Sequence, residues 1–242
     1  MKQNWKTGLC FLVVISLTGL LAIKGQKNAK DQEPDITHFP ILEYEKKPTA
    51  SNSNSEKKRK KYNNRHAPRI SESSGSIFSM SDWEVGLSAL PAAKSAAVIL
   101  GEVTQAQAQL SDDETNIYSE FTVQIENILK NDNNSSLGIG SSVVMERLGG
   151  RVRLPSGKVI VSQTYKQDLP RIGKRYVFFL TRDNEGEDFH ILTGYELRDG
   201  RVFPLDKLRS GHPITAYTGT SETSFFTDLN RILVNPSTSQ SR

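Results

Sequence analysis

The chain has 242 residues, a formal net charge of +4 and a pI near 9.1, and this length allows one domain with a sizeable core. The charge is unevenly placed: residues 1–80 carry 14 Lys and Arg against 7 Asp and Glu, whereas residues 81–242 carry 17 against 20. The acidic balance of the second part disfavours nucleic acid as its partner. The single cysteine, Cys10, excludes both a disulfide within the chain and a cysteine-based metal site.

The N-terminus carries an uncharged apolar segment, Gly8–Ile23, with Lys2 and Lys6 before it and Lys24 after it. A helix over this segment would span about 24 Å, and lysines at its ends can reach the headgroups. Residues 1–23 are therefore expected to be either an uncleaved signal anchor or a cleaved signal peptide. The first reading gives a single-pass membrane protein with its C-terminal domain outside the cytoplasm, and the second a secreted or periplasmic protein.

Residues 24–80 are rich in Ser, Asn, Lys and Glu and are expected to form a disordered basic stalk, since they offer little surface to bury. Within the stalk, Ile36–Leu42 is an apolar island that either docks on another surface or is only part of the linker. A basic run follows, and it is either a solvated linker segment or a contact for anionic lipid or an envelope polymer. Its residues are Lys57, Lys58, Arg59, Lys60 and Lys61.

The next region, residues 81–215, is expected to be a mainly β domain, because short runs of alternating or continuous apolar residues are separated by turn signals. A short helix over Ser81–Lys94 is expected before the first strand, with Ser81 as its N-cap. The expected strands are Ala97–Leu110, Asn116–Leu129, Val143–Leu148, Arg151–Leu154, Lys158–Gln163, Arg175–Thr181, Phe189–Thr193 and Arg201–Phe203.

The C-terminal residues 216–242 are expected to hold an amphipathic helix and a tail. The helix is predicted over Ser221–Leu233, with Ser221 as its N-cap and with Phe225, Leu229 and Ile232 on one face.

The order of apolar segments over residues 92–208 resembles the netrin-like, or tissue inhibitor of metalloproteinases-like, version of the OB-fold barrel. The segments are AAVILGEV, IYSEFTVQIENILK, IGKRYVFFL, FHILTGYEL and RVFPLDKL. The same pattern is similar to a β module of exported bacterial proteins of unknown role. The resemblance implies a small antiparallel OB-like barrel. It does not carry over the inhibitors' chemistry, because no position here matches their zinc-chelating N-terminal cysteine.

If the barrel is OB-like, its ligands are expected at the loops that join strands one to two and four to five. These loops, 111–114 and 183–188, are strongly acidic and would repel phosphates. Their candidate ligand-loop residues are Asp112, Asp113, Glu114, Glu185, Glu187 and Asp188. The calcium-loop spacing fails at 183–188, since Gly186 and Gly194 stand at positions four and twelve.

No histidine spacing, nucleophile motif or phosphate loop predicts a catalytic, metal or cofactor site. The leading hypothesis is therefore a non-enzymatic interaction module, either envelope-anchored or secreted, with a protein partner. The alternatives are a regulator or inhibitor of an extracellular protease, suggested by the resemblance, and a hydrolase with unrecognised carboxylates.

Overall fold

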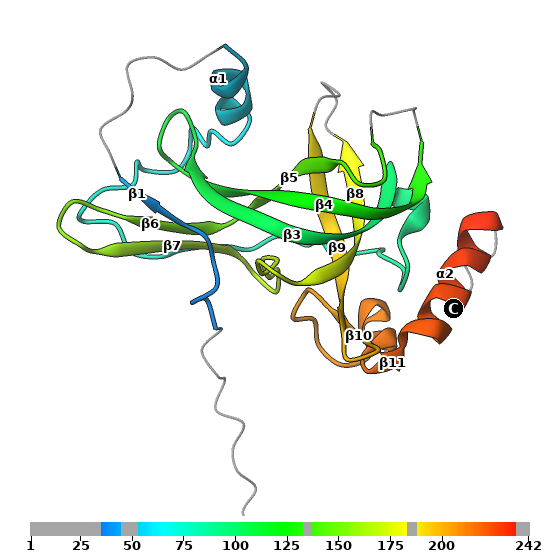
Figure 1. Cartoon of the computed structure of the whole chain (residues 1–242). Coiled ribbons are helices and arrows are strands. Elements are labelled where there is room, and N and C mark those ends of the chain that lie inside the picture. Colours follow the sequence, from blue (N-terminus) through cyan, green and yellow to red (C-terminus); the bar gives the residue numbers. More distant parts are fainter. Residues whose placement is uncertain (1–34, 45–52, 133–136, 183–187, 236–242) are drawn as a thin grey trace, which may run out of the picture. The chain divides into compact units, whose positions relative to one another are not determined.

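A computed structural model describes residues 35–44, 53–132, 137–182 and 188–235 (Figure 1). All of its helices and strands belong to a unit that spans Thr37–Arg242. The predicted membrane or signal segment, Gly8–Ile23, lies outside the described residues, as do Glu185 and Glu187. The unit is mainly β, as predicted, with two sheets and few helices.

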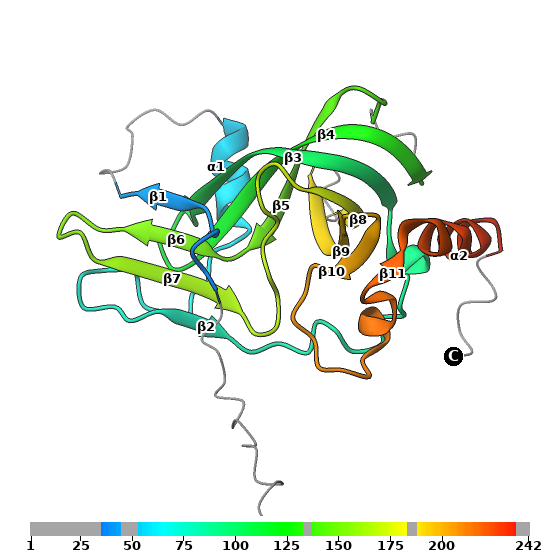
Figure 2. The same ribbon diagram turned by 60° about the horizontal axis from the view of Figure 1, so that its bottom comes forward.

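The larger sheet has seven strands in the order β11-β10-β9-β5-β4-β3-β8, and β9 also pairs with β8. The pairings of five strands therefore close on themselves, in the order β3-β4-β5-β9-β8 and back to β3 (Figures 1 and 2). All of these pairings are antiparallel except that of β5 with β9. The strands of this sheet are β3 (Ala97–Leu110), β4 (Ile117–Asn131), β5 (Ser142–Leu148), β8 (Arg175–Arg182), β9 (Phe189–Arg198), β10 (Arg201–Pro204) and β11 (Thr220–Ser221).

Alternation along β4 decides which side chains enter the core. Phe121, Val123 and Ile125 are at most 1% exposed, as predicted, whereas Glu120 and Thr122 point to the other face and are half-buried. The close pairing of β3 with β4 requires a glycine in β3: a Cβ atom on Gly101 would lie 2.5 Å from the Gln124 carbonyl oxygen. Strand β8 is buried over most of its length, in agreement with its apolar sequence.

The smaller sheet has the order β1-β6-β7-β2 (Figure 2). Its centre is the predicted hairpin, β6 (Gly150–Arg153) and β7 (Val159–Thr164), and its two outer strands come from the N-terminal region. Strand β1 (Ile41–Glu43) pairs in parallel with β6, and β2 (Ile77–Ser79) pairs in parallel with β7. These additions pair both edges of the hairpin, which would otherwise expose unpaired backbone groups.

The expectation of a disordered stalk over 24–80 is wrong for residues 37–44 and 53–80, which fold onto the β strands. The apolar island docks, since Phe39 is only 2% exposed, and Ile70 is 4% exposed in a small core beneath the hairpin. Helix α1 (Ser53–Lys60) contains most of the basic run. The composition of this region failed as a guide because its segments bury few side chains and are held by main-chain pairing and by charges.

The helix predicted over Ser81–Lys94 is also wrong, because only a short 3-10 turn, η1 (Ala92–Lys94), forms there. Gly86 has a φ of +70°, which a right-handed helix does not allow, and Pro91 has no N–H to donate. Leu87 and Leu90 nevertheless enter the main core.

The C-terminal helix, α2 (Glu222–Val234), is confirmed: the Ser221 hydroxyl caps it by accepting from the Ser224 N–H, and Phe225 and Leu229 are fully buried. A second 3-10 turn, η2 (Pro213–Tyr217), packs Ile214 into the same core.

Candidate functional site

Two glutamates face one another on the outer side of the ring of strands. Glu120 of β4 is directly opposite Glu146 of β5 in the antiparallel register, and Asp188 immediately precedes β9. The Glu146 side chain is 0% exposed, while those of Glu120 and Asp188 are 24% and 27% exposed. Like charges directly opposite one another destabilise a strand pair, so this arrangement requires a cation. We call these three residues the acidic face.

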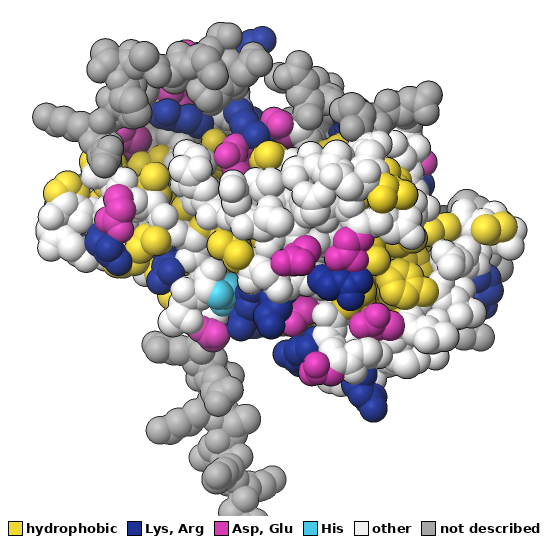
Figure 3. All heavy atoms as spheres, in the orientation of Figure 1, with side chains coloured by type: hydrophobic (Ala, Val, Ile, Leu, Met, Phe, Trp, Pro, Cys, Tyr) yellow, Lys and Arg dark blue, Asp and Glu magenta, His cyan; other side chains and the backbone are white. Residues whose placement is uncertain are grey.

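The cations come from the basic run. Lys58 Nζ lies 2.9 Å from Glu120 Oε1, 2.7 Å from Glu146 Oε1 and 3.4 Å from Asp188 Oδ1. Lys61 Nζ lies 2.6 Å from Glu146 Oε2 and 3.1 Å from Asp188 Oδ2. Near α1, in the upper part of Figure 3, Lys or Arg side chains accordingly lie among Asp or Glu side chains. The two amines neutralise two of the three carboxylates.

Tyr62 adds an aromatic contact to these ion pairs. Its ring stacks on that of Tyr118 with centroids 4.0 Å apart and planes 12° apart, and its hydroxyl donates to Glu146 Oε2 at 2.7 Å. Burial, and then the charge of Glu120, raise the pKa of Tyr118 above its ordinary value, so that ring stays neutral. The Tyr62 carbonyl oxygen accepts from Asn116 Nδ2 at 2.8 Å. We call residues 57–62 the basic segment.

The predicted ligand loop 111–114 lies beside the same segment. Arg59 Nη2 is 3.7 Å from Asp112 Oδ1, and the Asn64 N–H donates to Asp113 Oδ2 at 3.1 Å. Burial acts to raise the pKa of Asp113, but hydrogen bonds from Thr115, Ser111 and the Asn64 N–H outweigh it and hold the pKa below its usual range. Glu114 accepts from the Tyr44 hydroxyl at 3.3 Å. These carboxylates thus bind the chain's own N-terminal region.

The structure therefore brings together two sets of residues for which the sequence predicted separate roles. Asp112 and Asp188, from the predicted ligand loops, contact Lys58, Arg59 and Lys61 from the predicted anionic-surface run. The other two lysines of that run, Lys57 and Lys60, are exposed, and Lys60 pairs with Glu56 along the helix at 2.7 Å.

Glu120, Glu146 and Tyr62 were missed from the sequence. Glu120 stood on the predicted polar face of its strand, but only the register of β4 against β5 places it opposite Glu146.

A second charged cluster is buried between β5, β9 and the chain that follows β10. Arg147 forms a two-pronged pair with Asp206, at 2.9 and 3.0 Å, with side chains 2% and 0% exposed. Asp206 also accepts from the Thr193 hydroxyl at 2.7 Å and from the Asp168 N–H at 3.1 Å. Both carboxylate oxygens of Asp206 are matched by donors, and the cluster joins β5, β9 and the chain after β10, so we assign it a structural role.

Asp168 continues this network towards the surface. His38 Nε2 lies 2.9 Å from its Oδ1 atom, and Lys207 Nζ lies 3.1 Å from its Oδ2 atom. Burial acts to raise the pKa of Asp168, but the hydrogen bond and charge of His38, followed by Lys207, lower it by more. The carboxylate is thus stabilised in its charged form, and it ties the segment before β1 to the domain.

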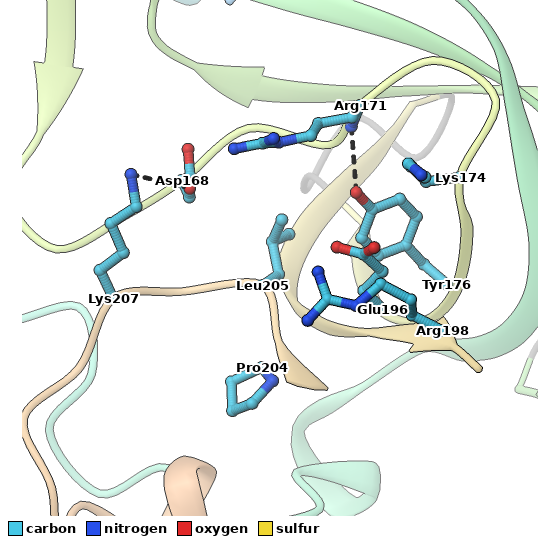
Figure 4. Close-up of a pocket in the computed structure, with 9 residues that line it drawn as sticks. All are labelled: Asp168, Arg171, Lys174, Tyr176, Glu196, Arg198, Pro204, Leu205 and Lys207. Atoms are coloured by element: carbon cyan, nitrogen blue, oxygen red, sulfur yellow. Dashed lines mark hydrogen bonds and ion pairs between the residues drawn. The ribbon is translucent and has the colours of Figure 1, made fainter. Parts of the chain in front are cut away.

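A pocket of about 270 Å³ lies next to Asp168 (Figure 4). At its wall the buried Tyr176 hydroxyl accepts from the Arg171 N–H at 3.1 Å. Both cationic and carboxylate side chains line the pocket, and Asp168 is already paired with His38 and Lys207. The lining of the pocket therefore defines no single class of ligand. The lining residues are Asp168, Arg171, Lys174, Tyr176, Glu196, Arg198, Pro204, Leu205 and Lys207.

No protein-family model matches the chain, and no curated protein matches it. Within the described ranges, no helix has both the length and the apolar character needed to cross a bilayer. Among the same described residues, no three His, Cys, Asp or Glu side chains form a group that could hold a metal ion. The acidic face is the feature of the described unit whose chemistry selects a ligand most clearly.

Proposed function

We propose that this protein is a non-enzymatic interaction module, either envelope-anchored through residues 8–23 or secreted, which binds a protein partner at its acidic face. The fold we propose for it is an OB-like barrel of the netrin-like type. The closed strand order supports this assignment, since β3, β4, β5, β8 and β9 correspond in chain order to strands one to five of a five-stranded Greek-key barrel, with the β6–β7 hairpin inserted between the third and the fourth.

The position of the acidic face fits this reading. OB-like barrels bind ligands on strands two and three and on the loops between strands one and two and between strands four and five. In this chain those elements are β4, β5, the turn that contains Asp112 and the connection that ends at Asp188. The acidic face and the predicted loop residues Asp112, Asp113 and Glu114 lie on these elements, although nothing in the sequence linked Glu120 to Glu146.

One observation carries the proposal: the fully buried carboxylate of Glu146 receives two lysine amines and one tyrosine hydroxyl from a peptide segment. A surface arranged in this way binds cationic groups and repels phosphates, so the expected partner is a protein and not a nucleic acid. We assign the proposed contact with anionic lipid or an envelope polymer to Lys57 and Lys60, which are the exposed lysines of helix α1.

The test is a crosslinking pulldown from native membranes with the intact protein, compared with an E120Q/E146Q variant. We expect a partner that the wild type captures and the variant loses. The fold of the variant is checked by its circular dichroism and its thermal midpoint. Capture that is equal in both proteins, or turnover of peptide, ester or glycan substrates that a point mutation abolishes, would contradict the proposed function.

A further inference from the structure

We infer that the partner displaces the basic segment from the acidic face. The partner binds there through a lysine-rich segment of its own. The inferred partner segment carries two lysines three positions apart and an aromatic residue next to the second. This inference rests on the proposed function and specifies the partner and the regulation of the same site.

The acidic face contacts the basic segment as a protein contacts a peptide ligand. Its three carboxylates form ion pairs with the amines of Lys58 and Lys61. Beside them, the Tyr62 ring stacks on Tyr118. Residues at the start of β4 also contact the main chain of the segment and of the residues after it, because Asn116 Nδ2 donates to the Tyr62 carbonyl oxygen and the Asn64 N–H donates to Thr115 Oγ1 at 2.9 Å. A combination of side-chain and main-chain contacts of this kind gives specificity for a peptide over a simple cation.

Ion pairs form much of the contact between the basic segment and the acidic face. The Lys58 and Lys61 side chains are 20% and 23% exposed, so salt screens part of their attraction to the acidic face. Helix α1 has eight residues, fewer than the roughly 12 to 15 that an isolated helix needs to be even marginally stable in water. Its order therefore depends on the acidic face. Phe39, by contrast, is 2% exposed and secures the segment before β1 by apolar burial.

The acidic face does not remain stable when it is empty. Release of the basic segment leaves Glu120 directly opposite Glu146 without the two lysine amines that pair with them. Like charges directly opposite one another destabilise a strand pair. The face therefore favours whichever lysine-rich segment is present, and the tethered copy has the advantage of a high effective concentration.

The inference is tested by fluorescence anisotropy with a labelled peptide of residues 53–66 and the full chain in detergent micelles. The K58A/K61A variant removes the two amines from the acidic face. The K57A/K60A variant is the matched control, since it removes the same charge from the same basic segment but leaves the acidic face covered. We expect K58A/K61A to bind the peptide at least about tenfold more tightly than the wild type, and K57A/K60A to behave as the wild type does.

Two further measurements establish that the peptide binds at the acidic face. Adding E146Q to K58A/K61A should abolish binding, and a peptide that itself carries K58A/K61A should not bind. If K58A/K61A does not fold, Tyr62→Ala replaces it, because this variant keeps both lysines and weakens only the stacking and hydroxyl contacts. It should also bind the peptide more tightly than the wild type.

A folded K58A/K61A variant that binds no more tightly than K57A/K60A would overturn the inference. So would Ca²⁺ that binds the opened variant and excludes the peptide, because the acidic face would then select a metal ion. Failure here is distinct from failure of the proposed function: a partner lost with E120Q/E146Q, together with no peptide binding, would retain the interaction module and remove the lysine-rich segment as its ligand.

Discussion

The buried pair of Arg147 and Asp206 gives a stability prediction whose size follows from its burial. Asp206→Ala leaves the guanidinium 2% exposed with no counter-charge, and it also deprives the Thr193 hydroxyl of its acceptor. Removing one partner of a buried ion pair costs about 3–5 kcal/mol in the free energy of unfolding. For a domain of this size, each kcal/mol lowers the melting temperature by about 2–4 °C, so the fall should be about 6–20 °C.

The assay is urea unfolding followed by circular dichroism, with two comparison variants. Glu43→Ala removes the exposed pair with Arg153, whose side chains are 58% and 47% exposed, and it should change the free energy of unfolding by less than about 1 kcal/mol. Arg147→Met in the Asp206→Ala background should recover part of the loss, since it removes the unpaired charge. A loss below about 1 kcal/mol for Asp206→Ala would refute the reasoning.

Three other predictions concern packing and pH. Gly101→Ala should lower the free energy of unfolding by about 1–3 kcal/mol in the same urea assay, because its Cβ would meet the backbone of β4, and an unchanged midpoint would contradict this. Phe225→Ala should cost about 3–5 kcal/mol, since its ring is fully buried against the ring of strands; a cost below about 1 kcal/mol would mean that α2 is not docked there. Asp168 has a lowered pKa in the folded protein, so it stabilises the fold above its unfolded pKa, and this contribution is lost as the pH falls below about 4. Asp168→Asn should therefore make stability fall less steeply as the pH falls below about 4, and identical acid profiles would count against the His38 and Lys207 contacts.

Local patterns were enough to predict much of the fold. Alternation at Phe121, Val123 and Ile125 identified the inward face of β4, and the Ser221 cap identified the start of α2. These features depend on residues within a few positions of one another, where the side-chain period and capping chemistry act directly. The turn at 111–114 was predictable for the same reason.

The features that define the acidic face depend on contacts between distant segments. Glu146 and Lys58 are 88 positions apart, and their pairing follows from the register of β4 with β5 and from where α1 docks. Composition suggested that residues 24–80 would not fold, because composition measures apolar burial and does not register ion pairs or strand addition. The helix expected at 81–94 failed at Gly86, whose left-handed conformation interrupts a right-handed helix, while the next residue, Leu87, packs into the core.

Proton NMR on the full chain in micelles tests the contact of the basic segment with the acidic face most directly. The Tyr62 and Tyr118 rings, assigned through Tyr→Phe variants, have centroids 4.0 Å apart and should show nuclear Overhauser effects between their ring protons. These effects should persist in K57A/K60A and weaken or vanish in K58A/K61A. Their absence from the wild type at low salt would show that the basic segment does not lie on the acidic face.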